Sequence, residues 1–158
     1  MSALAQPDVS CVCATESDTD AAAAALAARL QPGDVIVLTG DLGAGKTRFV
    51  QGVARALGID QEVTSPTFAI HVVYAGGALE LNHFDLYRLE SELDLEDIGY
   101  WEILEGDGAS FVEWGDKFPD ALPVDYALLD IQVDDGGNRV MRVEARGPRS
   151  MHLAESLG

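Results

Sequence analysis

Apolar residues fall into short runs along the chain, separated by glycine, proline and acidic residues. Residues 34–39 (DVIVLT) and 109–114 (ASFVEW) are compact apolar runs, typical of strands buried on both faces. Residues 16–34 and 47–58 carry the capping residues and apolar spacing that predict helices. Residues 9–14 predict a short edge strand. The first third of the chain therefore predicts a β-α-β unit.

The remainder of the chain has a different pattern. Residues 67–85 contain two strand-like runs joined by Ala75, Gly76 and Gly77, which predicts a hairpin. Residues 126–147 predict a second hairpin around the turn DDGGN, and the acidic residues 89–104 predict a helix. The proline-containing residues 115–123 predict an irregular loop, and residues 149–158 predict a tail of uncertain order. We expect an α/β three-layer sandwich whose central sheet mixes parallel and antiparallel strands.

Composition and charge narrow the class of protein. With 47% hydrophobic and 23% charged residues, residues 1–158 predict one globular domain. No apolar run approaches the ~18 residues of a membrane helix, and the N-terminus lacks the features of a signal peptide, so we expect a cytoplasmic protein with no membrane partner. The net charge of −17 disfavours direct nucleic-acid binding, so any role near RNA would pass through a partner protein. The only cysteines, Cys11 and Cys13, are expected to be reduced.

The strongest motif is GDLGAGKT, residues 40–47, which matches the P-loop pattern at every fixed position. It follows the buried strand 34–39 and opens a helix, the context in which glycine-rich backbone and a helix N-terminus bind phosphates. We therefore expect a P-loop NTPase-like fold that binds a nucleoside triphosphate, ATP, with Mg²⁺. Lys46 would reach the β- and γ-phosphates, and the Thr47 hydroxyl would bind Mg²⁺. The expected nucleotide-binding residues here are Asp41, Leu42, Gly43, Ala44, Gly45, Lys46, Thr47 and Arg48.

A P-loop enzyme also needs a carboxylate at the end of a neighbouring strand to hold the magnesium ion. Glu113 ends an apolar run, whereas Asp85 ends a run in which polar and apolar residues alternate. Such alternation suits a half-exposed hairpin strand better than a central parallel strand. The sequence therefore favours Glu113 as the metal ligand, with Asp85 acting on water or near the γ-phosphate. Two simpler interpretations stay open: Asp85 could cap a turn, and Glu113 could be a surface residue.

Thr64 and Ser65 lie between the P-loop helix and the next strand. A loop hydroxyl at this place can sense the γ-phosphate, although a Ser-Pro turn would explain the same residues.

Other P-loop functions fit less well. A small-molecule kinase would need a lid segment rich in arginine, and the arginines are dispersed, although Arg88 alone could reach the site. A GTPase would need an Asn-Lys-x-Asp base reader, which the sequence lacks. A nucleotide-gated binding module that hardly hydrolyses ATP stays open, because the sequence has no dedicated water-orienting glutamine or arginine finger.

Four segments in order, GDLGAGKT, TSPTF, HFDLYRLE and EWGDKFPDALP, resemble the TsaE (YjeE) family. This family comprises small bacterial ATPases of the tRNA threonylcarbamoyladenosine pathway, and the resemblance extends from about Thr15 to Gly147. The P-loop alone is shared with a vast superfamily, whereas the other three segments at this spacing are far more specific. The chain departs from the family pattern at EWGDK, where relatives often have EWGE or EWP, so the second acidic group, Asp116, is shorter than a glutamate.

The resemblance implies roles for individual residues and partners. Thr47 and Glu113 would hold Mg²⁺, Asp85 and Lys46 would belong to the catalytic centre, and Thr64 and Ser65 to a switch-like loop. Trp114 would flank the nucleotide, and Thr15 and Arg139 would form the adenine pocket. The implied partners are the TsaD transferase and its companion TsaB, with tRNA reached only indirectly through that complex. We expect ATP hydrolysis that is slow in the isolated protein and dependent on these partners.

Overall fold

The computed structural model describes residues 8–40, 45–61, 63 and 70–157. The strands are β1 (Asp8–Cys13), β2 (Val35–Gly40), β3 (His71–Tyr74), β4 (Leu81–Asp85), β5 (Ala109–Glu113), β6 (Tyr126–Val133) and β7 (Arg139–Arg146). The helices are α1 (Glu16–Ala27), α2 (Lys46–Ala56), α3 (Glu92–Asp97), α4 (Tyr100–Leu104) and α5 (Pro148–Glu155), with short 3₁₀ turns η1 (Gly115–Lys117) and η2 (Pro119–Ala121).

The described strands form one seven-stranded sheet in the order β1-β7-β6-β2-β5-β4-β3. Strand β2 pairs in parallel with β5 and β6, and β4 pairs in parallel with β5. The outer pairs β1–β7, β6–β7 and β3–β4 are antiparallel. The predicted α/β fold with a mixed central sheet is therefore confirmed. Because β2, β5 and β4 run in the same direction, their carboxyl ends meet at one edge of the sheet.

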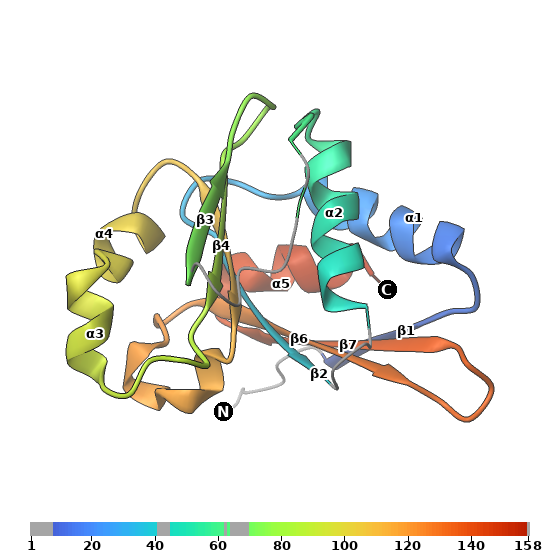
Figure 1. Ribbon diagram of the computed structural model, residues 1–158. Coiled ribbons are helices and arrows are strands. Elements are labelled where there is room, and N and C mark those ends of the chain that lie inside the picture. The colour runs from blue at the N-terminus through green and yellow to red at the C-terminus, as the bar shows by residue number, and fades with distance from the viewer. Residues whose placement is uncertain (1–7, 41–44, 62, 64–69, 158) are drawn as a thin grey trace.

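Helices on opposite faces of the sheet enclose two hydrophobic cores (Figure 1). Helices α1, α2 and α5 cover one face, where Ile36, Phe49 and Met141 are buried. Helices α3 and α4 lie on the other face, over Phe84 and Val112. Among the described residues, no helix combines the length and apolar character that crossing a membrane requires.

Helix α1 starts with a capping box and packs closely on α2. The Thr15 hydroxyl accepts from the backbone N–H of Asp18 at 3.1 Å, and the Asp18 carboxylate accepts from the Thr15 backbone N–H at 3.2 Å. Small residues permit the close approach, since a Cβ at Gly52 would lie 2.8 Å from the Cβ of Ala23. This contact fixes the orientation of α2, the helix that begins with Lys46.

The strand ending at Asp85 forms the predicted hairpin with β3, but the expectation that it is half-exposed was wrong. Every residue of β4 is buried, and the strand lies inside the sheet between β3 and β5. Its polar residues have partners in the interior: Asn82 Oδ1 lies 3.0 Å from His71 Nε2, and His83 Nε2 lies 2.8 Å from Glu113 Oε2. Alternation of polar and apolar residues therefore reflected internal pairing, not solvent exposure.

Two other segments differ from the simple sequence pattern. The helix expected over residues 89–104 is divided into α3 and α4, because Gly99 adopts a φ of +71° between them. Residues 149–155, expected to belong to a tail of uncertain order, lie in helix α5. Pro148 occupies the first turn of α5, and the Asp125 carboxylate accepts from the backbone N–H groups of Arg149 and Ser150 at 2.9 and 3.1 Å.

Gly40 ends β2 with a φ of +134°, and a Cβ added there would overlap the carbonyl oxygen of Ile131 on β6. We expect Gly40→Ala to lower the free energy of unfolding by about 3 kcal/mol or more, because the cost of the strained backbone conformation adds to the cost of the steric overlap. Gly33→Ala is the control: Gly33 has a φ of +88° but no atom within 4 Å, so only the strain of about 1–2 kcal/mol applies. Urea unfolding measures both, and equal losses would contradict the expected overlap.

Candidate functional site

The N-terminus of α2 lies at the carboxyl edge of the parallel strands. β2 ends at Gly40, and α2 begins at Lys46 after Gly45, which has a φ of +102°. The first turn of a helix has backbone N–H groups without partners in the helix, and these groups and the helix dipole favour an anion. Thr47, the second residue of α2, is half-buried beside this end.

Lys46 points back across the edge of the sheet. Its Nζ donates to the carbonyl oxygen of Gly40 at 3.2 Å and lies 3.7 Å from Glu113 Oε1. Only 13% of the lysine side chain and 7% of the glutamate side chain are exposed, so this ion pair is mostly shielded from water. The lysine is thus held beside the C-terminal residue of β5 and at the start of α2.

Glu113 and Asp85 are neighbours on adjacent parallel strands. They are direct register partners, and both are at least 95% buried. The second oxygen of Glu113, Oε2, lies 2.8 Å from His83 Nε2, while Asp85 Oδ1 accepts from the backbone N–H of Tyr87 at 3.0 Å. The sheet therefore brings the two carboxylates proposed from the sequence to one place, with Lys46 beside them.

His83 is the residue of this cluster that sequence reasoning missed. No sequence motif assigns it a role, and its side chain is 0% exposed. The available signal was its position two residues before Asp85, because alternate residues of a strand share one face of the sheet.

A small cavity of about 90 Å³ opens beside Lys46. It is lined by Leu38, Thr39, Gly40, Lys46 and Trp114. Trp114 has a φ of +62°, is 44% exposed, and its ring lies 4.9 Å from the ring of Tyr87. The tryptophan expected from the family resemblance to flank the nucleotide therefore lies beside this part of the site.

A second cavity, of about 250 Å³, lies between β1, α1 and the start of α2. Thr15, Gly45, Arg48 and Arg139 all line it, although they are far apart in the sequence. Arg139 reaches this place because it is the register partner of Cys13, and a Cβ at Gly45 would lie 3.2 Å from Arg139 Nε. Thr15 and Arg139, the two residues expected in the base pocket, thus line one cavity together with Gly45 and Arg48 of the expected phosphate site.

Two groups at this cavity have shifted pKa values. The hydrogen bond from Arg48 to Asp20, with its ion pair at 2.8 Å, raises the pKa of the Arg48 guanidinium. Burial raises the pKa of the Cys13 thiol to about 11, so this thiol stays protonated near neutral pH. Cys11 and Cys13 are free cysteines with sulfur atoms 3.9 Å apart, as expected for reduced thiols.

Some expected site residues lie outside the described residues. Asp41, Leu42, Gly43 and Ala44 of the predicted phosphate-binding loop belong to this group, as do Thr64 and Ser65 of the predicted switch loop. Their roles stay predictions.

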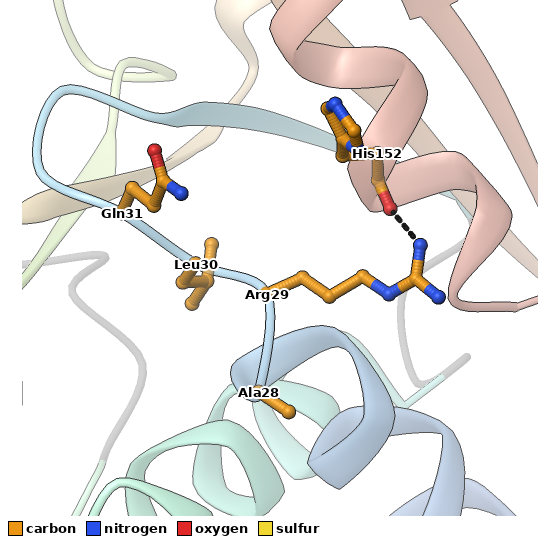
Figure 2. A pocket seen from close by; sticks show the side chains of 5 residues that line it. All are labelled: Ala28, Arg29, Leu30, Gln31 and His152. Carbon is orange, nitrogen blue, oxygen red and sulfur yellow. Dashed lines mark hydrogen bonds between the residues drawn. The ribbon is translucent and has the colours of Figure 1, made fainter.

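A larger cavity lies elsewhere in the molecule. It has a volume of about 550 Å³ and is lined by Ala28, Arg29, Leu30, Gln31 and His152 (Figure 2). Arg29 Nη1 donates across it to the carbonyl oxygen of His152 at 2.9 Å. None of the site residues expected from the sequence lines this cavity, so its size does not mark the candidate site.

The fold and this cluster define an α/β protein with paired acidic residues and a lysine at the carboxyl edge of its parallel strands. A family model described as threonylcarbamoyl adenosine biosynthesis protein TsaE matches residues 13–142. Because this match covers most of the chain, the chain belongs to the TsaE family.

Individual relatives agree with the family match. The chain is 42% identical over 133 residues to the tRNA threonylcarbamoyladenosine biosynthesis protein TsaE of Treponema pallidum, covering 84% of this chain and 98% of the relative. It is 42% identical over 140 residues to the Bacillus subtilis protein of the same name, covering 89% and 87%. A crystal structure of Bacillus subtilis YdiB aligns with a TM-score of 0.82 and 35% identity, covering 96% of this chain and 95% of that chain. Membership of this family assigns the chain to tRNA threonylcarbamoyladenosine biosynthesis.

Proposed function

We propose that the protein is a P-loop ATPase that binds ATP with Mg²⁺ at the junction of β2 and α2. The observation that carries the proposal is the shielded pair of Lys46 and Glu113, 3.7 Å apart at the N-terminus of α2, with Asp85 in register beside Glu113. One cation faces the place where phosphates would lie, and two buried carboxylates adjoin it. Buried charged groups gathered at one edge of a sheet are typical of metal and catalytic sites.

The residues suit Mg²⁺, which prefers oxygen ligands from carboxylates, hydroxyls and phosphates. Glu113 and the Thr47 hydroxyl would hold the ion, which would neutralise the phosphate charge. Lys46 would exchange its contact with Glu113 for the β- and γ-phosphates and orient them. Asp85, ending the neighbouring strand, would hold the attacking water near the γ-phosphate.

The cavity bounded by Thr15, Gly45, Arg48 and Arg139 would receive the adenine base. It adjoins the start of α2, so a nucleotide whose phosphates lie at Lys46 can extend its base toward it. Its volume of about 250 Å³ is compatible with a purine. Arg139 would stack on or hydrogen-bond to the base edge.

The reaction would support tRNA threonylcarbamoyladenosine formation by the TsaB–TsaD transferase complex. The named relatives belong to this pathway, and the net charge of −17 favours binding to protein over binding to RNA. The tRNA would then be reached only through the complex.

Measuring ATP hydrolysis with and without TsaB and TsaD tests this proposal. We expect the isolated protein to turn over far more slowly than the ~1–100 s⁻¹ typical of kinases, and the partners to increase the rate. A pull-down with TsaB and TsaD, with and without ATP, tests nucleotide-dependent assembly. Fast hydrolysis by the isolated protein would contradict partner dependence, whereas ATP-dependent assembly without hydrolysis would favour a nucleotide-gated module.

A further inference from the structure

His83 is a buried residue that the proposed reaction does not yet use. It lies in the middle of β4, is 0% exposed, and pairs in register with Phe111 of β5. Because alternate residues of a strand point to the same face, His83 lies on the same face of the sheet as Asp85. Its Nε2 lies 2.8 Å from Glu113 Oε2.

The two oxygens of Glu113 are engaged by different groups. Oε2 accepts from His83, whereas Oε1 lies 3.7 Å from Lys46 Nζ. A carboxylate on a flexible side chain can rotate about its last bonds, and one strong hydrogen bond to a rigid ring removes much of that freedom. The bond from His83 therefore leaves Oε1 as the oxygen directed toward the start of α2.

A purely packing role explains His83 poorly. Its Nδ1 is buried and has no hydrogen-bond partner in the described part of the chain. A buried polar atom without a partner destabilises the folded state, and a leucine or phenylalanine in the same space would avoid this destabilisation. The ring is therefore useful through Nε2, which carries the hydrogen that it donates to Glu113.

We propose that His83 is a positioning residue that fixes the Glu113 carboxylate for Mg²⁺ binding. The inference rests on the proposed function, in which Glu113 is a metal ligand. Outer residues that orient a metal ligand commonly change metal affinity or activity by about 10–100-fold when they are lost. His83 would thus act on the metal through Glu113, without touching the nucleotide.

The test is calorimetric titration of the full-length protein with ATP, once in EDTA and once in Mg²⁺. We expect His83→Leu to leave ATP affinity in EDTA nearly unchanged and to reduce the gain in affinity from Mg²⁺ by about tenfold. His83→Gln should restore most of the gain, because its amide N–H₂ reaches about as far as Nε2. His83→Asn should not restore the gain, because the asparagine side chain is too short to bring its amide to Glu113. The glutamine and asparagine variants keep the comparison valid if the leucine variant does not fold.

The control is His71→Leu on the neighbouring strand. His71 is bonded to Asn82 at 3.0 Å and stacked on Phe84 with ring centroids 4.4 Å apart, and no contact with Glu113 is found among the described residues. It should keep the full Mg²⁺ response. In a Glu113→Ala background, His83→Leu should cause no further loss, which separates positioning from a general effect on folding.

The outcomes distinguish this inference from the function on which it rests. An unmodified protein whose ATP affinity does not respond to Mg²⁺ overturns both. A normal Mg²⁺ response in His83→Leu, or equal losses in the glutamine and asparagine variants, overturns the positioning role alone.

Discussion

Replacing Lys46 with alanine is expected to weaken ATP binding by about 10- to 100-fold, because hydrogen bonds to charged groups contribute about 1.5–3 kcal/mol. The substitution removes the positive charge of the described site that would face the β- and γ-phosphates. It also leaves Glu113, whose side chain is 7% exposed, without its cation at 3.7 Å. Isothermal calorimetry with ATP and Mg²⁺ measures the affinity, and thermal unfolding reports the second effect.

Arg55→Ala is the matched control for Lys46→Ala. Arg55 lies on the same helix, its side chain is 63% exposed, and its ion pair with Asp20 at 3.6 Å lies on the surface. Both substitutions remove one positive charge from α2, so a general electrostatic effect would weaken ATP binding equally in both. Unchanged ATP affinity in Lys46→Ala would count decisively against the assignment of residues 40–47 as a P-loop.

Glu113→Ala is expected to weaken the Mg²⁺ dependence of ATP binding more than Asp85→Ala. A direct metal ligand should cost at least about the tenfold lost with an outer partner. Asp85 would act on water, so its loss should lower the hydrolysis rate more than the metal dependence. Titrations with ATP across a range of Mg²⁺ concentrations, combined with turnover rates, separate the two effects.

Two further variants make this comparison specific. Asp85→Asn retains an acceptor for the backbone N–H of Tyr87, now 3.0 Å from Asp85 Oδ1, and so separates loss of charge from loss of that bond. Glu102→Ala removes an exposed acidic residue from α4, on the opposite face of the sheet, and should leave the Mg²⁺ dependence intact. A larger loss of Mg²⁺ dependence in Asp85→Ala than in Glu113→Ala would show that the carboxylates were assigned the wrong way round.

The sequence located the buried strand ending at Glu113, because Phe111 and Val112 are consecutive apolar residues facing opposite sides of the sheet. It misjudged the strand ending at Asp85 for a physical reason. Asn82 and His83 are polar, but each is paired inside the protein with a residue from another strand. Periodicity reports polarity, and only the three-dimensional pairing decides whether a polar side chain faces water.

The cavity around Thr15 and Arg139 illustrates a second limit of sequence patterns. These residues approach each other because β1, near the start of the chain, pairs with β7, near its end. No local periodicity specifies which distant strands pair, so only resemblance to the family suggested this cavity. Local patterns did not predict helix α5 either. The carboxylate of Asp125, which lies before β6, accepts from backbone N–H groups in the first turn of α5.

Helix α5 also shows that the unit that must fold is longer than the segment shared with the family model. The match ends at residue 142, yet Val143 and Ala145 of β7 and Leu153 of α5 are buried in the larger core. At the other end, β1 begins at Asp8, before the match starts at residue 13. A fragment trimmed to the matched residues would expose the apolar side of the sheet that α5 covers, so expression of this protein for any of these experiments should retain both flanks.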